Sequence, residues 1–151
     1  MGRLKGCGFP IPTESEEQQA LFEWAALQRG RYPELSLLFH IPNGGYRGKA
    51  EAGRFKAEGV KSGVPDICLP VARGGFHGLF IEMKRQRGSI TSEAQKDWIR
   101  QLAKQGYKAV ICKGWQEAAQ IIADYLNMPL LRMGGNEAGQ EAGQNALQYA
   151  T

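Results

Sequence analysis

The sequence predicts an α/β domain in which a mixed sheet of about four strands is flanked by helices. Short apolar runs typical of strands lie at residues 65–70, 78–83 and 107–112. Stretches with helix periodicity and capping residues surround these runs, and one of them separates the last two. Since a strand–helix–strand order is typical of a crossover, we expect the last strand to pair parallel to a predecessor.

The first helix is predicted to begin after Thr13, a suitable N-cap, and to end near residue 29, before a glycine. Three acids in its first turn complement the helix dipole: Glu14, Glu16 and Glu17. Its apolar stripe includes Leu21 and Trp24. Residues 1–13, which hold Gly, Pro and one Cys without periodicity, are expected to form a flexible arm.

The next apolar run, Leu35 to Ile41, predicts a strand that ends at the turn sequence Pro42-Asn43-Gly44-Gly45. Residues 49–58 alternate small and charged side chains, and we expect a short basic helix there. The sequence Arg73-Gly74-Gly75 separates the runs at 65–70 and 78–83, which predicts a hairpin-type turn.

Two further helices complete the predicted order of helix, strand, helix, two strands, helix, strand and helix. One spans about Ser92 to Gln105, and the last spans about Trp115 to Leu126. Residues 132–151 are rich in Gly, Gln, Asn and Ala, which is typical of a disordered tail. The folded domain is therefore expected to cover residues 14–131.

Composition and charge narrow the class of protein. The net charge of +4 and the pI near 9.1 permit a polyanionic partner. The histidines, His40 and His77, and the three cysteines supply no zinc signature, and a reducing cytoplasm is the simplest setting. No apolar run approaches the roughly 20 residues that span a bilayer, so we expect no membrane segment.

Two carboxylates and a lysine lie at the ends of the predicted hairpin strands, in Gly63-Val64-Pro65-Asp66 and Ile81-Glu82-Met83-Lys84. Because Glu82 and Lys84 are two residues apart, they point to the same face of a strand. We expect Asp66, Glu82 and the backbone carbonyl of Met83 to bind Mg²⁺. Lys84 would either hold the attacking water or stabilise the developing negative charge.

Each motif alone has an ordinary explanation. A Glu-x-Lys pair on a half-exposed strand is typical of a solvated face, and Pro65-Asp66 alone can simply begin a strand. Both motifs together, at a spacing that fits two neighbouring strands, favour metal-dependent phosphodiester hydrolysis.

These two motifs, with Ser92-Glu93-Ala94-Gln95 after them, resemble the VRR-NUC family of the PD-(D/E)xK nuclease superfamily. The small stand-alone members from bacteriophages and prophages are the most similar, and the resemblance covers about Glu14 to Leu126. It implies a restriction-endonuclease-like core and Mg²⁺- or Mn²⁺-dependent endonuclease activity on DNA. It also implies a preference for branched structures such as four-way (Holliday) junctions, and a homodimer, in a bacterial or phage-infected cell.

By this resemblance, Asp66, Glu82 and Lys84 match the family's aspartate, glutamate and lysine, and Gln95 matches a glutamine after the third strand. We expect Gln95 to orient Lys84 or to contact a phosphate, although an exposed helix glutamine is the alternative.

The superfamily often adds a glutamate from the first helix. Glu17 is favoured over Glu14 and Glu16, because Leu21 and Trp24 follow it on the same face and would aim it inward. A helix-dipole role for all three acids is the alternative.

Basic residues on both sides of the acids are expected to contact the DNA backbone without reading its sequence. They are Arg47, Lys49, Arg54, Lys56, Lys61, Arg85 and Arg87. A solvated helix face is the alternative for the first five. Asn43 could also reach the site, although Asn-Gly is ordinarily turn chemistry. His77, in the hairpin loop, is not expected to be catalytic.

The leading function is thus a structure-selective DNA endonuclease. A non-catalytic DNA-junction-binding module is the alternative, and a nuclease acting on RNA or single strands is a third possibility. Paired cuts across a junction need two sites related by a twofold axis, which favours a dimer. Its interface is not readable from the sequence; Trp115 and Tyr125, or residues 35–46, are candidates.

Overall fold

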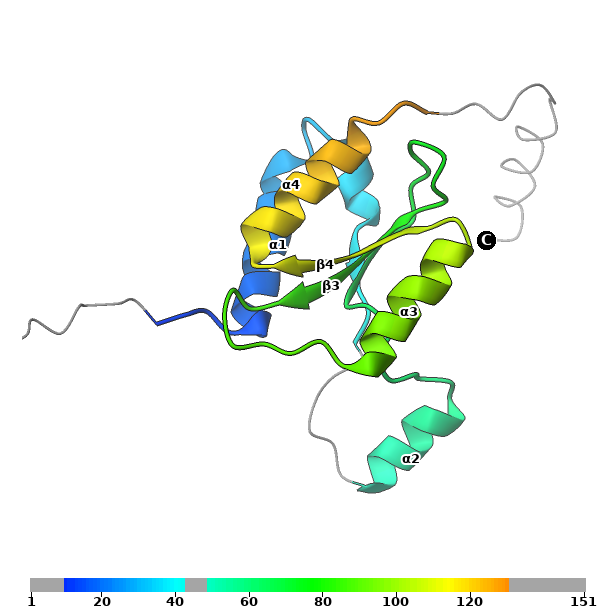
Figure 1. Ribbon diagram of the computed structural model, residues 1–151. Helices are drawn as coiled ribbons and strands as arrows, with labels where there is room; N and C mark the ends of the chain where they lie inside the picture. The colour runs from blue at the N-terminus through cyan, green and yellow to red at the C-terminus, as the bar shows by residue number, and fades with distance from the viewer. Residues whose placement is uncertain (1–9, 43–48, 131–151) are drawn as a thin grey trace, which may run out of the picture.

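The computed structural model describes residues 10–42 and 49–130, with side chains from residue 53 in the second segment. The elements, in chain order, are α1 (Glu14–Gln28), η1 (Pro33–Leu37), β1 (Phe39–His40), α2 (Lys49–Ala57), β2 (Ile67–Leu69), β3 (Leu79–Lys84), α3 (Glu93–Lys104), β4 (Lys108–Lys113) and α4 (Trp115–Leu126). This order confirms the predicted one (Figure 1). Within the described segments, no helix is long and apolar enough to cross a membrane. The predicted tail and residues 1–9 of the predicted arm lie outside the described residues.

The four strands form one sheet in the order β1-β2-β3-β4. The first two pairings are antiparallel, whereas β3 and β4 are parallel and are connected through α3. The predicted crossover is therefore confirmed. Between β2 and β3 the chain reverses at Gly74 and Gly75, whose φ angles of +56° and +86° are readily adopted by glycine. Arg73 and Phe76 form an antiparallel bridge across this turn.

The strand predicted over residues 35–41 is mostly wrong. Pro33 begins a 3₁₀ helix, a position that suits its fixed φ angle, and only Phe39 and His40 are extended. The buried side chains of this segment are Leu35 and Leu38, which are three residues apart. That spacing is typical of helical turns and not of the alternation of a strand.

The two faces of β3 differ in character. Leu79, Ile81 and Met83 belong to the main apolar core, which α1 and α4 cover. Glu82 and Lys84 alternate with these residues and point to the opposite face, the side of α3. Figure 1 shows α1 and α4 together on one side of the sheet and α3 on the other.

Tyr125 belongs to this core and not to an interface. The residue is 0% exposed, and its hydroxyl donates a hydrogen bond of 2.6 Å to the carbonyl of Val71. It was a candidate for the dimer surface, and its burial excludes that role. Cys68 and Cys112 are buried, and burial raises the pKa of both thiols, that of Cys112 to about 12.

Candidate active site

The pairing of β2 with β3 brings the two predicted acids together. Ile67 pairs with Ile81, and this antiparallel register, continued by one residue, places Asp66 opposite Glu82. Directly opposed residues of an antiparallel pair point to the same face of the sheet. The peptide N–H of Met83 donates a hydrogen bond of 2.8 Å to Oδ2 of Asp66, which holds the carboxylate against β3.

The backbone carbonyl of Met83 lies on the edge of β3 that faces β2 and Asp66. The N–H and C=O groups of one strand residue point to the same side, and the Met83 N–H points to Asp66. The β2–β3 register places Pro65 opposite Met83. Because proline has no N–H to donate, this carbonyl cannot form the usual ladder hydrogen bond with Pro65. The geometry therefore fits the expectation that the carbonyl is a metal ligand.

Glu82 is only 1% exposed, and two donors converge on one of its oxygens. The ammonium of Lys84 lies 2.9 Å from Oε1, and the side-chain amide of Gln95 donates to the same atom. The other oxygen, Oε2, is buried and has no hydrogen-bond partner among the described residues. A buried carboxylate oxygen without a hydrogen-bond partner is unfavourable unless another group interacts with it.

Gln95 contacts Glu82, whereas we expected it to orient Lys84 or to meet a phosphate. Its carbonyl oxygen accepts a hydrogen bond of 2.8 Å from the N–H of Ser92, the N-cap of α3. The Ser92 hydroxyl in turn accepts from the N–H of Gln95. This capping box fixes the Gln95 side chain, so α3 begins with a rigid donor directed at the site.

Lys84 also lies 3.5 Å from Oε1 of Glu14, at the start of α1. Glu14 is therefore the first-helix acid that the structure brings to the site. With Asp66 and Glu82 it makes three carboxylates around one ammonium, which leaves a formal charge of −2 when all four groups are ionised. A divalent cation would balance that charge.

The pKa values follow from burial and from this charge cluster. Burial raises the pKa of the Asp66 carboxyl, and the Met83 N–H only partly opposes it. Burial also raises the pKa of Glu82 to about 7, with the Lys84 contact opposing and the charges of Asp66 and Glu14 adding to it. Burial acts to lower the pKa of Lys84, but its hydrogen bond to Glu82 and the surrounding carboxylates raise it overall.

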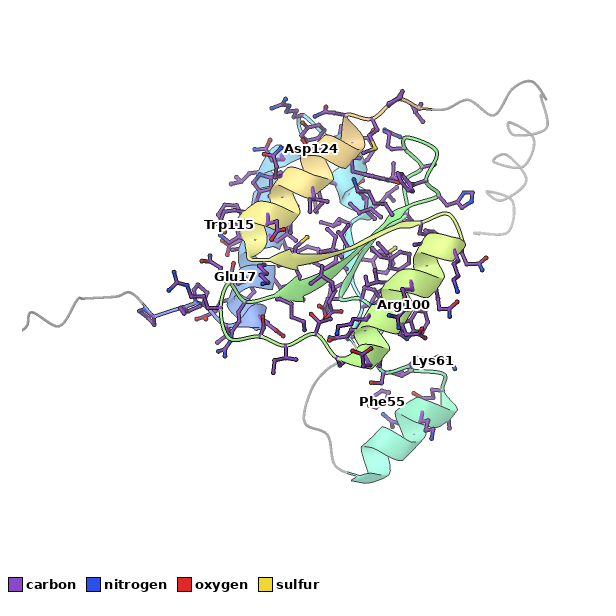
Figure 2. All side chains as sticks on the ribbon, viewed as in Figure 1. Glu17, Phe55, Lys61, Arg100, Trp115 and Asp124 are labelled. Carbon is purple, nitrogen blue, oxygen red and sulfur yellow. The ribbon has the colours of Figure 1, made fainter. Side chains whose placement is uncertain are left out.

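Glu17 points inward as predicted but contacts a different part of the molecule. It is 1% exposed, and Oε2 accepts a hydrogen bond of 2.8 Å from the N–H of Trp115. Figure 2 shows Glu17, on α1, close to Trp115 at the start of α4. The N-cap of α4 is Gly114, which has no side chain to satisfy the first N–H groups. In the structure Glu17 supplies that cap and contacts none of the acids, Lys84 or Gln95.

The predicted basic side chains that the structure describes lie on the surface. Arg54, Lys56 and Lys61 are exposed on α2 and in the segment after it, and α2 stands apart from the sheet in Figure 1. Arg54 lies 3.6 Å from Glu58. Arg85 and Arg87 are exposed in the loop that follows Lys84. Arg47, Asn43 and the side chain of Lys49 lie outside the described residues.

His40 is a site residue that the sequence did not reveal. Its Nδ1 atom lies 2.8 Å from the backbone carbonyl of Asp66. It lines a cavity of about 200 Å³ whose other walls are Glu14, Ser15, Gln18, Asp66 and Met83. His77 precedes the other end of β3 and packs edge-on against Tyr107, with ring centroids 5.7 Å apart.

The residues fit a hydrated divalent cation better than a metal held by protein ligands alone. Among the described residues, no group of three or more His, Cys, Asp or Glu side chains is placed to hold a metal ion. The unpartnered Oε2 of Glu82 and the excess negative charge both favour a cation. Mg²⁺ keeps several waters and needs only one or two carboxylates.

The VRR-NUC domain family matches residues 12–116 of the chain. A solved structure described as a VRR_NUC domain protein is 36% identical to the chain, with a TM-score of 0.69. That similarity covers 80% of this chain and 93% of the other. No curated protein matches the sequence. The matched range includes the three carboxylates of the site as well as Lys84 and Gln95.

Proposed function

The chain belongs to the VRR-NUC family, and from that premise we propose that it is a metal-dependent endonuclease that cleaves branched DNA. VRR-NUC domains are in general nuclease domains, so DNA is the expected partner. The main support from the structure is the buried carboxylate of Glu82, which faces Asp66, receives Lys84 and Gln95 at Oε1, and has no partner for Oε2 among the described residues.

Asp66, Glu82 and the carbonyl of Met83 are the residues that would hold Mg²⁺ or Mn²⁺. The bound ion would neutralise phosphate charge and lower the pKa of a water molecule. Gln95 holds the Glu82 carboxylate in place through its amide, which donates to Oε1 and leaves Oε2 to the cation. The Met83 N–H does the same for Asp66.

Lys84 is better suited to stabilise charge than to remove a proton. Its ammonium is buried among three carboxylates, which favour the charged form. A fixed positive charge beside the scissile phosphate stabilises the negative charge that develops in the transition state. The exposed Arg85 and Arg87, which follow Lys84 directly, would meet the DNA backbone beside the cut.

The preference for branched DNA rests on the family resemblance and on geometry. One site makes one cut, so paired cuts across a four-way junction require a homodimer with two sites. Further basic side chains lie on α2 and just after it, namely Arg54, Lys56 and Lys61. They would contact a second arm of the junction.

The test is to incubate the purified protein with linear, flapped and four-way DNA, with and without Mg²⁺ or Mn²⁺. We expect metal-dependent cleavage of the four-way substrate, and its loss in Asp66→Asn but not in the control Asp124→Asn, an exposed acid on α4. Equal cleavage by both variants would contradict the assigned site. Binding to the four-way junction that persists with Mg²⁺, without any cleavage, would favour a non-catalytic module. Cleavage of linear DNA alone would contradict the proposed preference for branched DNA.

A further inference from the structure

The proposed mechanism leaves one polar residue of the site without a role. His40 lies on the edge strand β1, where it pairs with Ile67 of β2. Its side chain is exposed, yet Nδ1 is held 2.8 Å from the carbonyl of Asp66. The Ile41 N–H donates a 2.7 Å hydrogen bond to the same carbonyl, which is thereby fixed.

This contact defines the tautomer of His40. A backbone carbonyl only accepts hydrogen bonds, so Nδ1 must carry the hydrogen. In the neutral ring Nε2 therefore keeps its lone pair and is an acceptor. Histidines that ligate a metal are oriented by the same kind of contact, in which the other ring N–H donates to a carboxylate or a backbone carbonyl.

The cavity of about 200 Å³ that His40 lines also borders two of the three predicted metal ligands, Asp66 and Met83, whereas Glu82 is not among its lining residues. Glu14 adds a second carboxylate to its lining. The cavity is large enough for several water molecules.

We propose that His40 belongs to the metal site, where its Nε2 atom accepts a hydrogen bond from a water molecule of the hydrated divalent cation. This inference rests on the proposed function only for the presence of the cation. In this position His40 contacts a metal-bound water and not the ion itself. That agrees with the described residues, among which no group of three His, Cys, Asp or Glu side chains could hold a metal ion, and with the waters that Mg²⁺ retains. By orienting a water beside Asp66, His40 would be a positioning residue for the attack on phosphorus.

The first test is nuclear magnetic resonance of the two imidazole rings, made at pH 8 without DNA. Because the chain has two histidines, His77 is an internal control. We expect His40 to show the Nδ1–H tautomer, and substoichiometric Mn²⁺ to broaden the His40 signals well before those of His77. An Nε2–H tautomer, or equal broadening of both rings, would overturn the proposal.

The second test separates the two ring nitrogens by substitution. His40→Asn keeps a donor near the position of Nδ1, and so retains the Asp66 contact, but lacks an acceptor at the position of Nε2. We expect it to lower kcat or Mn²⁺ affinity about tenfold, with DNA binding in Ca²⁺ and the thermal midpoint unchanged. His77→Asn is the matched control. Wild-type activity and Mn²⁺ affinity in His40→Asn would show that only the Nδ1 contact matters, and would refute the proposal.

The two tests distinguish this inference from the proposed function. If no DNA is cleaved but Mn²⁺ selectively broadens His40, the metal-site role stands and the nuclease proposal fails. If DNA is cleaved and His40→Asn changes neither cleavage nor Mn²⁺ affinity, the nuclease proposal stands and the role of His40 fails.

Discussion

The two faces of β3 carry opposite chemistry within one short strand. One face presents Leu79, Ile81 and Met83 to a core that α1 and α4 close completely. The other presents Glu82 and Lys84 beneath α3, which the structure describes in full and which has no buried residue. Apolar burial on the first face stabilises the sheet, and this allows desolvated charges to be kept on the second. Stability and reactivity are thus separated by strand alternation, and each can be perturbed alone.

The largest expected effect comes from removing the charge on the polar face. Lys84→Met keeps much of the side-chain volume but removes the ammonium, and should lower cleavage by about 10³-fold. The rate on four-way DNA with saturating Mg²⁺ measures this effect. Lys104→Met, in the last turn of α3, should cleave like the wild type. A cleavage rate for Lys84→Met within threefold of the wild-type rate would contradict the assignment of reactivity to the polar face.

On the apolar face the effect should appear in stability. Ile81→Ala leaves a cavity beneath α1 and α4 and should lower the free energy of unfolding by about 2–5 kcal/mol. Urea unfolding measures the change. The fraction that remains folded should still cleave, because the side chain of Ile81 does not contact the acids. If catalysis is lost in fully folded Ile81→Ala, the two faces are coupled.

The pH dependence of stability sharpens the comparison further. The pKa of Glu82 is raised from 4.5 to about 7, so the folded state holds its proton over a range in which the unfolded state has lost it. The metal-free protein should therefore lose stability as the pH rises from about 4.5 through 7, by at most about 3 kcal/mol. Glu82→Gln should remove most of this slope, and Glu23→Gln, an exposed acid, should not. Urea unfolding at several pH values measures how the free energy of unfolding depends on pH. An unchanged pH dependence in Glu82→Gln would contradict the role of Glu82.

The smallest expected effect concerns how α3 is held over the polar face. Gly63 has a φ angle of +84°, and an added Cβ would lie 2.9 Å from the backbone of Ala94, beside Gln95. Gly63→Ala should lower stability by about 1–3 kcal/mol and reduce cleavage as Gln95 shifts. Gly53→Ala, in open space within α2, should gain roughly 0.5–1 kcal/mol. Thermal unfolding compares the two, and similar behaviour would show that Gly63 does not position α3.

Most of the fold was predictable because its signals are local. The N-caps Thr13 and Ser92 both form capping boxes, and the helices that follow begin where predicted. The alternation in β3 and the crossover through α3 were likewise visible in the sequence. The segment around Leu35 was not, because four consecutive apolar or small residues there fit both a strand and a 3₁₀ turn.

The site was predictable only where its residues share one hairpin. Asp66, Glu82 and Lys84 follow from motif spacing and strand alternation. The choice between Glu14 and Glu17 depends on where α4 begins, because the uncapped N–H of Trp115 takes Glu17. The role of His40 depends on a contact with a residue 26 positions away, for which a single sequence carries no signal.

The hairpin that carries Asp66, Glu82 and Lys84 also has a consequence for how the chain folds. Hairpins form within about 1–10 μs, faster than contacts between distant segments. We therefore expect the two acids to be brought face to face before α3 docks on their side of the sheet. At neutral pH their repulsion opposes this early step, while Lys84, on the same hairpin, is the first charge available to offset it. Lys84 would thus offset this repulsion in the hairpin before it takes up the role proposed for it in the active site.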